Sequence, residues 1–141
     1  MEMNRNRQPI KLGVERLLAE KIDLLRGARV GLVCNQASVD HSFRHVADVF
    51  HENPDIHLTT LFGPQHGIRG DAGPGDNVNS YTDSKSGLPV YSLYKNGSGI
   101  APIKDMLEGI DILAYDVQDV GARFYTYIST MYQSMKACKE Y

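Results

Sequence analysis

The run RVGLVCN, residues 29–35, limits the possible folds more than any other segment of this chain. Its apolar residues are contiguous and do not alternate with polar ones, which is typical of a strand that is covered on both faces. Strands of that kind occur in parallel sheets with helices packed on each side. We therefore expect residues 29–35 to form a central strand of an α/β fold.

Further segments of both kinds alternate along the chain. Three more runs have the length and composition of strands, residues 56–62, 89–94 and 110–117. Apolar residues recur at helical spacing in four other segments, residues 14–25, 42–50, 102–107 and 124–138. Alternating strands and helices predict an open, doubly wound, mostly parallel sheet with right-handed crossovers.

The last of these helices carries an apolar stripe. Its members step by three or four residues: Phe124, Ile128, Met131, Met135 and Cys138. This spacing predicts an amphipathic helix whose stripe faces the core. Cys34 and Cys138 each lie within an apolar pattern, so we expect both to be buried thiols that form no disulfide or metal site.

Composition excludes some classes of partner. The chain has 141 residues and 42% hydrophobic side chains, enough for one domain with its own core. A formal net charge of -2 predicts no broad attraction for nucleic acid or anionic lipid, and no apolar run has membrane-spanning length. The start lacks the apolar region of a secretory signal, so we expect a cytoplasmic protein. A lost leader would instead place it outside the cell or in the cell envelope.

One glycine-dense segment stands out, FGPQHGIRGDAGPGD, residues 62–76. It opens a stretch, residues 63–88, that has no periodicity, and long loops of that kind in compact domains are usually binding loops or disordered. Neither of the common glycine-rich phosphate motifs fits the spacing, so no nucleotide or other cofactor is predicted. The segment supplies four candidate polar side chains: Gln65, His66, Arg69 and Asp71.

Other polar residues follow the remaining strands. In doubly wound sheets, ligands bind beyond the carboxyl ends of the strands. Asn35 ends the first strand, and the last strand leads into a set of polar and aromatic residues: Asp116, Gln118, Asp119, Arg123 and Tyr125. Amides, carboxylates, guanidinium groups and aromatic rings together suit a sugar. The competing interpretation is that turns and helix caps favour Asp and Asn, and that Asp119 and Arg123 form a helix pair.

His41 and His45 are four residues apart in the helix expected over residues 42–50. That spacing can present two imidazoles to one metal ion, but no third ligand lies close in the sequence. We therefore interpret both as solvated helix residues and predict no metal site.

Four segments carry a family resemblance: RVGLVCNQASVD, LFGPQHGIRGDAGPGDNVNSYTD, GLPVYSLY and DILAYDVQDVGARFYTYISTM. They closely resemble the N-terminal region of the NamZ-type exo-β-N-acetylmuramidases, glycoside hydrolase family 171, formerly a domain family of unknown function. The resemblance runs from about Val14 to the end of the chain.

The resemblance implies a Rossmann-like catalytic domain followed by a smaller C-terminal domain. It also implies release of N-acetylmuramic acid from the non-reducing ends of peptidoglycan fragments, without a cofactor. Family members are considerably longer, so we expect residues 1–141 to be the N-terminal portion of the Rossmann-like domain, with a truncated sheet and without the C-terminal domain. Sheet edges exposed in this way would favour self-association.

The resemblance also assigns roles. The family motif usually reads PEHG, whereas this chain has Pro64-Gln65-His66-Gly67. An amide cannot transfer the proton that glycoside hydrolysis needs. If the family glutamate is the acid, the chain is a non-catalytic or vestigial muropeptide-binding fragment. If Gln65 only orients water or substrate, His66 is the acid or base, with Asp116 or Asp119 as the partner carboxylate.

The remaining candidates would bind substrate. Arg69 and Arg123 are candidates for the lactyl carboxylate that distinguishes N-acetylmuramic acid from N-acetylglucosamine, since arginine contacts carboxylates through two hydrogen bonds. The other predicted substrate-binding residues are Asn35, Asp71, Gln118 and Tyr125.

Overall fold

The computed structural model describes residues 10–70, 73, 80–95 and 98–141. Within them, the main sheet has five strands in the order β3-β4-β2-β1-β7. Four strands are parallel, and only β3 is antiparallel to its neighbour β4. The strands of this sheet are β1 (Arg29–Cys34), β2 (His57–Gly63), β3 (Tyr81–Thr82), β4 (Pro89–Ser92) and β7 (Ile112–Asp116). The predicted α/β fold with a mostly parallel sheet is confirmed.

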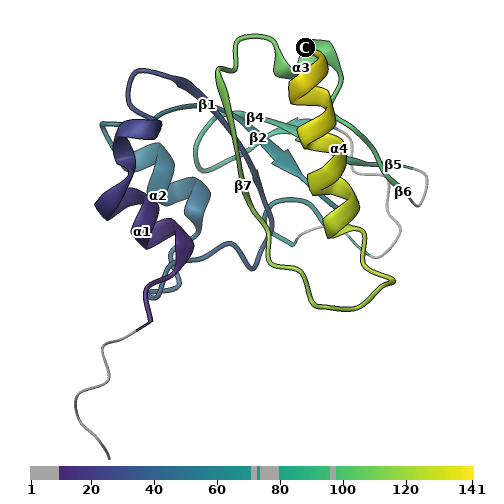
Figure 1. The fold of residues 1–141 in the computed structure, drawn as a ribbon, viewed down its shortest axis with the longest axis horizontal. Coiled ribbons are helices and arrows are strands. Elements are labelled where there is room, and N and C mark those ends of the chain that lie inside the picture. Colours follow the sequence, from purple (N-terminus) through teal and green to yellow (C-terminus); the bar gives the residue numbers. More distant parts are fainter. Residues whose placement is uncertain (1–9, 71–72, 74–79, 96–97) are drawn as a thin grey trace, which may run out of the picture.

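The other elements connect these strands. A small ribbon pairs β5 (Tyr94–Lys95) with β6 (Ser98–Gly99). The helices are α1 (Gly13–Glu20), the short 3-10 helix η1 (Ile22–Leu24), α2 (Val46–Glu52), α3 (Lys104–Leu107) and α4 (Tyr127–Glu140). Figure 1 shows α1 and α2 on one side of the sheet and α3 and α4 on the other. No helix in the described part of the chain is long and apolar enough to cross a membrane.

The order of the parallel strands creates a switch point. The chain moves outward from β1 through β2 to β4, and it then returns to the opposite side of β1 as β7. Crossovers therefore leave β1 in both directions, and the carboxyl ends of β1 and β7 border a crevice where ligands bind in such sheets. Cys34 pairs with Asp116 in the register, so Asn35 and Asp116 lie at this point.

Strand β1 lies inside the sheet, between β2 and β7, and both of its faces are covered. Val30, Leu32 and Cys34 are fully buried in the cluster that includes residues of α1 and α2. Val33 belongs to the second cluster, which contains residues of α3 and β7. The contiguous apolar run thus contributes side chains to the clusters on both faces of the sheet, as its lack of alternation predicts.

Gly31 allows the second face to pack closely. A Cβ atom at this position would lie 2.9 Å from Ile110 Cδ1, 3.0 Å from Leu113 Cδ1 and 3.1 Å from Phe62 Cε2. Real Cβ atoms do not approach other carbons so closely without displacement of a neighbour. Glycine at position 31 therefore leaves room for the side chains of Ile110, Leu113 and Phe62 to pack over β1.

The orientation predicted for α4 is wrong. Its buried residues are Tyr127, Thr130, Ser134 and Ala137. The predicted stripe instead contains side chains that are 96% exposed at Phe124, 58% at Ile128 and 66% at Met135. The buried face of α4 thus carries Thr130, Ser134 and Ala137 beside Tyr127, whereas most of the predicted stripe is exposed.

The prediction for the two cysteines is half correct. Cys34 is buried in β1, whereas Cys138 is exposed on α4. The difference arises because Cys138 belongs to the predicted apolar stripe of α4, most of which is exposed. Met131, at the border of the two faces, is half-buried.

The helix expected over residues 42–50 begins later. Residues Asp40 to Arg44 form a turn in which the Asp40 carboxylate accepts the backbone N–H groups of Ser42 and Arg44. Helix α2 then starts at Val46, with His45 as its N-cap. Asp40 competes with helix formation because its side chain satisfies backbone donors locally.

Candidate functional site

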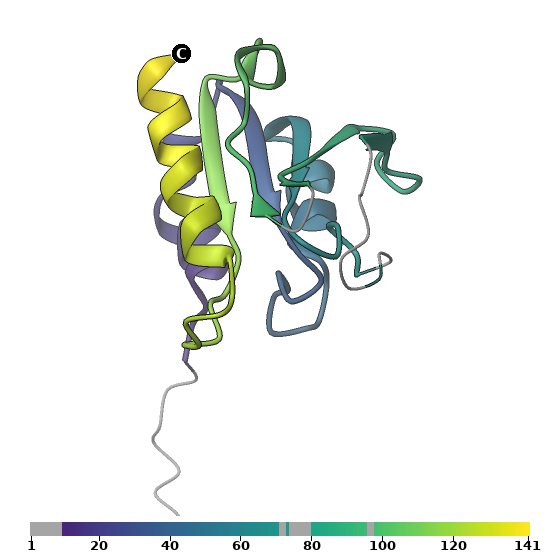
Figure 2. The ribbon, with the colours of Figure 1, turned by 90° about the vertical axis from the view of Figure 1, so that its right-hand side faces the viewer.

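Three segments meet at one edge of the sheet. Asn35 follows β1, the glycine-dense loop follows β2, and Asp116 ends β7. Because these strands are parallel, their carboxyl ends lie at the same edge, and Figure 2 shows the arrowheads of β1 and β7 pointing the same way. The expectation that Gln65, His66 and Asp116 follow strands at one common edge agrees with this topology.

Asp116 has the most unusual carboxyl group of this edge. Its Oδ1 accepts a hydrogen bond of 3.1 Å from Gln118 Nε2. Its Oδ2 is buried and has no hydrogen-bond partner among the described residues. Burial raises the pKa of this carboxyl, since the charged form loses solvation, although Gln118 opposes the shift. The Asp116 side chain is therefore suited to hold a proton more tightly than a solvated aspartate.

Asn35 and Ser38 shape the turn beside Asp116. Both are buried. The Asn35 Oδ1 accepts the Ala37 N–H at 3.0 Å, and Ser38 Oγ accepts the Asn35 N–H at 2.9 Å. Ser38 Oγ also donates to the Asp116 carbonyl oxygen and so ties β1 to β7. The side-chain oxygen of Asn35 is therefore used to form this turn, as the competing interpretation of Asn residues after strands predicts.

The loop after β2 folds back on itself. A Cβ atom at Gly63 would lie 3.2 Å from the backbone of Gly67, and the Gly67 N–H donates to the Pro64 carbonyl oxygen at 3.1 Å. Within this turn His66 has a φ of 75° in the left-handed region. Such values are uncommon for residues other than glycine and are found disproportionately at functional sites. Gln65 and His66 are both half-buried.

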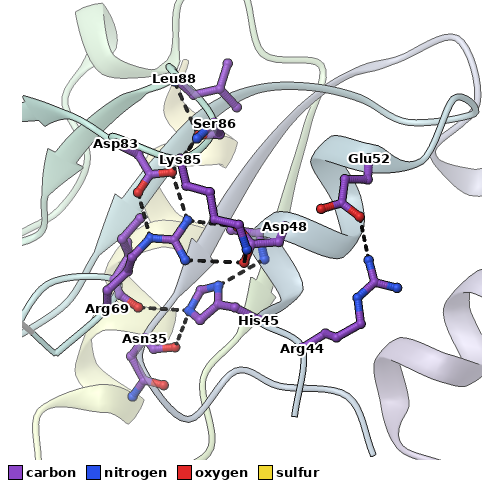
Figure 3. Close-up of polar contacts among 12 residues, drawn as sticks. Asn35, Arg44, His45, Asp48, Glu52, Arg69, Asp83, Lys85, Ser86 and Leu88 are labelled. Atoms are coloured by element: carbon purple, nitrogen blue, oxygen red, sulfur yellow. Dashed lines mark hydrogen bonds and ion pairs between the residues drawn. The ribbon is translucent and has the colours of Figure 1, made fainter. Parts of the chain in front are cut away.

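Arg69 lies in an ion-pair network, shown in Figure 3. Its Nε and Nη2 donate to Asp83 at 2.7 and 2.9 Å. Nη2 and Nη1 also donate to Asp48, at 2.9 and 3.4 Å, and Lys85 Nζ donates to the same carboxylate at 2.6 Å. The carboxylate-binding role predicted for Arg69 would therefore require an existing ion pair to break.

The network changes the acidity of its members. The Arg69 hydrogen bond holds the pKa of Asp83 well below its usual range, and the hydroxyl and N–H of Ser86 add to this effect. Burial alone would raise the pKa of Asp48, but hydrogen bonds from Arg69 and Lys85 lower it. The two aspartates in turn raise the pKa of Arg69 above its ordinary value. Asp48, Asp83 and Arg69 are therefore charged over the physiological range.

His45 was missed by the interpretation of the sequence. Its Nε2 lies 3.0 Å from the Asn35 carbonyl oxygen and 2.9 Å from that of Ile68. Its Nδ1 accepts the Ala47 N–H at 3.2 Å, so Nε2 carries the proton. The predicted solvated role is therefore wrong for His45, while His41 is exposed and contacts Glu15. The one available signal was its place directly before the apolar helical run.

The loop between β7 and α4 carries the remaining candidates, and it is exposed. Asp119 Oδ1 accepts the Gly121 N–H at 2.7 Å and so closes a turn. Arg123 makes no hydrogen bond or ion pair within the described part of the chain, and it lines a hollow of about 440 Å³ with Asp119. The Tyr125 ring is half-exposed and packs edge-on against Tyr127, at 5.8 Å between ring centroids.

The remaining points concern Asp71 and metal ligands. Asp71 lies outside them, so its predicted role stays a prediction. Within the described ranges, no group of three His, Cys, Asp or Glu side chains could hold a metal ion.

Comparison with known proteins places this geometry in a family. The sequence model described as "Exo-beta-N-acetylmuramidase NamZ, N-terminal" matches residues 30–141. The chain belongs to the NamZ family. Peptidoglycan beta-N-acetylmuramidase NamZ of Bacillus subtilis (strain 168) is 52% identical over 131 residues, which cover 93% of this chain and 31% of that protein. The resemblance predicted from sequence motifs is confirmed.

Two solved structures share the NamZ-family fold. Both are DUF1343 family proteins of Bacteroides fragilis NCTC 9343. The first has a TM-score of 0.82 and 44% identity, and the match covers 92% of this chain and 32% of that one. The second has a TM-score of 0.73 and 31% identity, with 95% and 33% covered. The chain thus spans about a third of the length of these relatives.

Proposed function

We propose that this NamZ-family chain supplies catalytic groups to a glycoside hydrolase that releases N-acetylmuramic acid from the non-reducing ends of peptidoglycan fragments. The observation that carries the proposal is the half-buried Asp116 at the switch point, whose Oδ2 is buried without a hydrogen-bond partner among the described residues and whose pKa is raised. The relative of this chain in Bacillus subtilis is named as a peptidoglycan β-N-acetylmuramidase. A carboxyl whose pKa is raised by desolvation suits the acid step of glycoside cleavage.

In this mechanism Asp116 donates its proton to the glycosidic oxygen as the bond from that oxygen to C1 breaks. His66 takes a proton from the water whose oxygen bonds to C1. Asp116 fits the acid role better than Asp119, because Asp119 is exposed and its carboxylate caps a turn. Gln118 holds the Asp116 carboxyl in place through its amide.

Substrate contacts come from the same edge. Arg123 is the better candidate for the lactyl carboxylate, because its guanidinium has no partner in the described part of the chain, whereas Arg69 has two. Tyr125 presents an exposed ring to the apolar face of a sugar. The Asn35 amide nitrogen and Asp71 complete the proposed set.

A hydrolysis assay tests the assignment. The substrate is a chromogenic N-acetyl-β-D-muramide, and the variants are Asp116→Asn, Asp119→Asn and Asp105→Asn, the last an exposed control on α3. Loss of a general acid costs about 100-fold or more in rate. We expect this loss for Asp116→Asn and a smaller loss for Asp119→Asn. Equal activity of Asp116→Asn and the control would overturn the acid role.

Gln65 favours a second candidate function, a muropeptide-binding protein without turnover. It occupies the position where the family motif usually has glutamate, and an amide transfers no proton. Activity that appears only in Gln65→Glu would make binding the function of the natural chain. Binding of N-acetylmuramic acid without turnover in either form supports the same conclusion. If neither binding nor turnover occurs, both functions are rejected.

A further inference from the structure

Three contacts between described residues attach the loop that carries Gln65 and His66 to its surroundings. At its start, the Gly63 carbonyl oxygen accepts the Leu93 N–H at 2.7 Å. Near its end, the Ile68 carbonyl oxygen accepts a hydrogen bond from His45 at 2.9 Å. The third attachment is the Arg69 side chain, and it is the only one of the three that carries charge.

The Arg69 attachment joins elements that are far apart in the sequence. Asp48 lies in α2, and Asp83 directly follows β3, at the far edge of the sheet. Both carboxylates are almost completely buried, with side chains 7% and 2% exposed. Figure 3 shows the guanidinium between them. A planar guanidinium with N–H groups on several sides can bridge two carboxylates, whereas an ammonium cannot reproduce this geometry.

Burial of these carboxylates makes the contact strong. A buried carboxylate that loses its cation is left without compensation, which is strongly destabilising. Lys85 supplies a second cation to Asp48, but for Asp83 the ion pair found among the described residues is with Arg69. The network therefore holds the backbone at Arg69, just after the Gln65–His66 turn, in one position.

We propose that Arg69 is a positioning residue, which holds the Gln65–His66 turn at the carboxyl edge through Asp48 and Asp83 and does not contact the substrate. The proposal rests on the proposed function for its consequence in catalysis. It departs from the role predicted for Arg69 from sequence, which was to bind the lactyl carboxylate.

Hydrogen exchange of the folded 141-residue chain tests the attachment without any need for activity. The variants are Arg69→Met, Arg69→Lys and the control Arg44→Met, which removes an exposed arginine that pairs with Glu52 at 2.7 Å. We expect the Gly67 amide to exchange about tenfold faster or more in Arg69→Met, while the Val33 amide in β1 is unchanged. Arg69→Lys should recover part of the protection, and Arg44→Met should change neither amide.

Two results would overturn the proposal. One is an unchanged Gly67 amide in Arg69→Met, and the other is equal acceleration at Gly67 and Val33, which indicates a general loss of stability. If Arg69→Met does not fold, Asp83→Asn replaces it, because it removes the charge but keeps an oxygen acceptor. The same outcomes then apply.

A binding measurement separates positioning from substrate contact. The ratio of affinities for N-acetylmuramic acid and N-acetylglucosamine reports on recognition of the lactyl carboxylate. We expect Arg69→Met to lower the affinities for both sugars by the same factor, so that their ratio is unchanged. A ratio that falls about tenfold or more, as loss of a charged contact predicts, would make Arg69 a ligand of the carboxylate and overturn the proposal. Failure of the proposed function would instead appear as absent binding in the wild type, with the exchange result intact.

Discussion

Asp116 and Asp119 are three residues apart, yet their carboxyl groups lie in different surroundings. Asp116 ends a strand at the switch point and is half-buried, so desolvation raises its pKa. Asp119 lies on an exposed turn and accepts a backbone N–H. The sequence left the two as equal candidates for the partner carboxylate. Only the position relative to the sheet, which sets solvation, separates them.

The close approach at Gly31 leads to a prediction on stability. Gly31→Ala should lower the free energy of unfolding by about 1–3 kcal/mol, because the added methyl overpacks the contact with Ile110, Leu113 and Phe62. Gly13→Ala is the control, since its Cβ would have no atom within 4 Å at the start of α1. Urea denaturation measures both. Equal stability of the two variants would contradict the packing argument.

The network at Arg69 leads to a prediction on pH. The Arg69 hydrogen bond holds the pKa of Asp83 below its ordinary value of 3.8. As pH falls, the unfolded chain therefore takes up this proton first. The stability that Asp83 contributes is complete above about pH 5, and it decreases progressively as the pH falls from about 4 toward the lowered pKa of the folded state. Urea midpoints measured between pH 6 and about pH 3 should fall less in Asp83→Asn than in the wild type.

The control for this titration is Asp105→Asn, which should keep the pH dependence of the wild type. Asp105 is exposed on α3 and has no ion pair within the described residues. A pH dependence of Asp83→Asn that equals the wild type would show that the ion pair contributes no stability.

At the scale of elements, the apolar spacing of α4 predicted the presence of the helix but not the face that it buries. The spacing correctly predicted a helix, because the steps of three and four residues depend only on local geometry. It did not predict which face the helix buries. Thr130 and Ser134 lie at helical spacing on another face, and they are buried. Figure 2 shows α4 alongside β7.

Substitutions on the two faces of α4 test this orientation. Met135→Ala should lower the free energy of unfolding by less than about 0.5 kcal/mol, because the side chain is 66% exposed. Ala137→Leu should cost about 1–3 kcal/mol, because Ala137 is only 3% exposed and has no room to grow. Thermal or urea denaturation measures both. A cost of about 2 kcal/mol or more for Met135→Ala would restore the predicted core stripe.

At the scale of the whole molecule, the apolar outer face of α4 lies beside an exposed sheet edge. Strand β7 pairs only with β1 among the described residues, and all five of its residues are half-buried. Unpaired strand edges and adjacent apolar surface both favour association between copies. We therefore predict that the chain self-associates through this face.

Sedimentation velocity over a range of concentrations measures this association. The double variant Ile128→Lys with Met135→Lys should shift the protein toward monomer, because it places two charges on the apolar face. Leu24→Lys is the control. This residue is 64% exposed and lies in η1, which follows α1 in the chain. Figure 1 shows α1 on the side of the sheet opposite α4. A wild-type chain that stays monomeric at every concentration, or equal effects of the variant and the control, would contradict the prediction.

The sequence alone determined the fold class, the family and the edge of the sheet that carries the polar residues. These follow from local patterns: contiguous apolar runs, helical spacing, and the placement of polar residues directly after strands. The tertiary structure alone decided which carboxyl is desolvated, which face α4 buries, that His45 contacts two carbonyl groups, and that Arg69 pairs with Asp48 and Asp83. Burial and ion pairing depend on neighbours that are distant in the chain, and no local spacing encodes them.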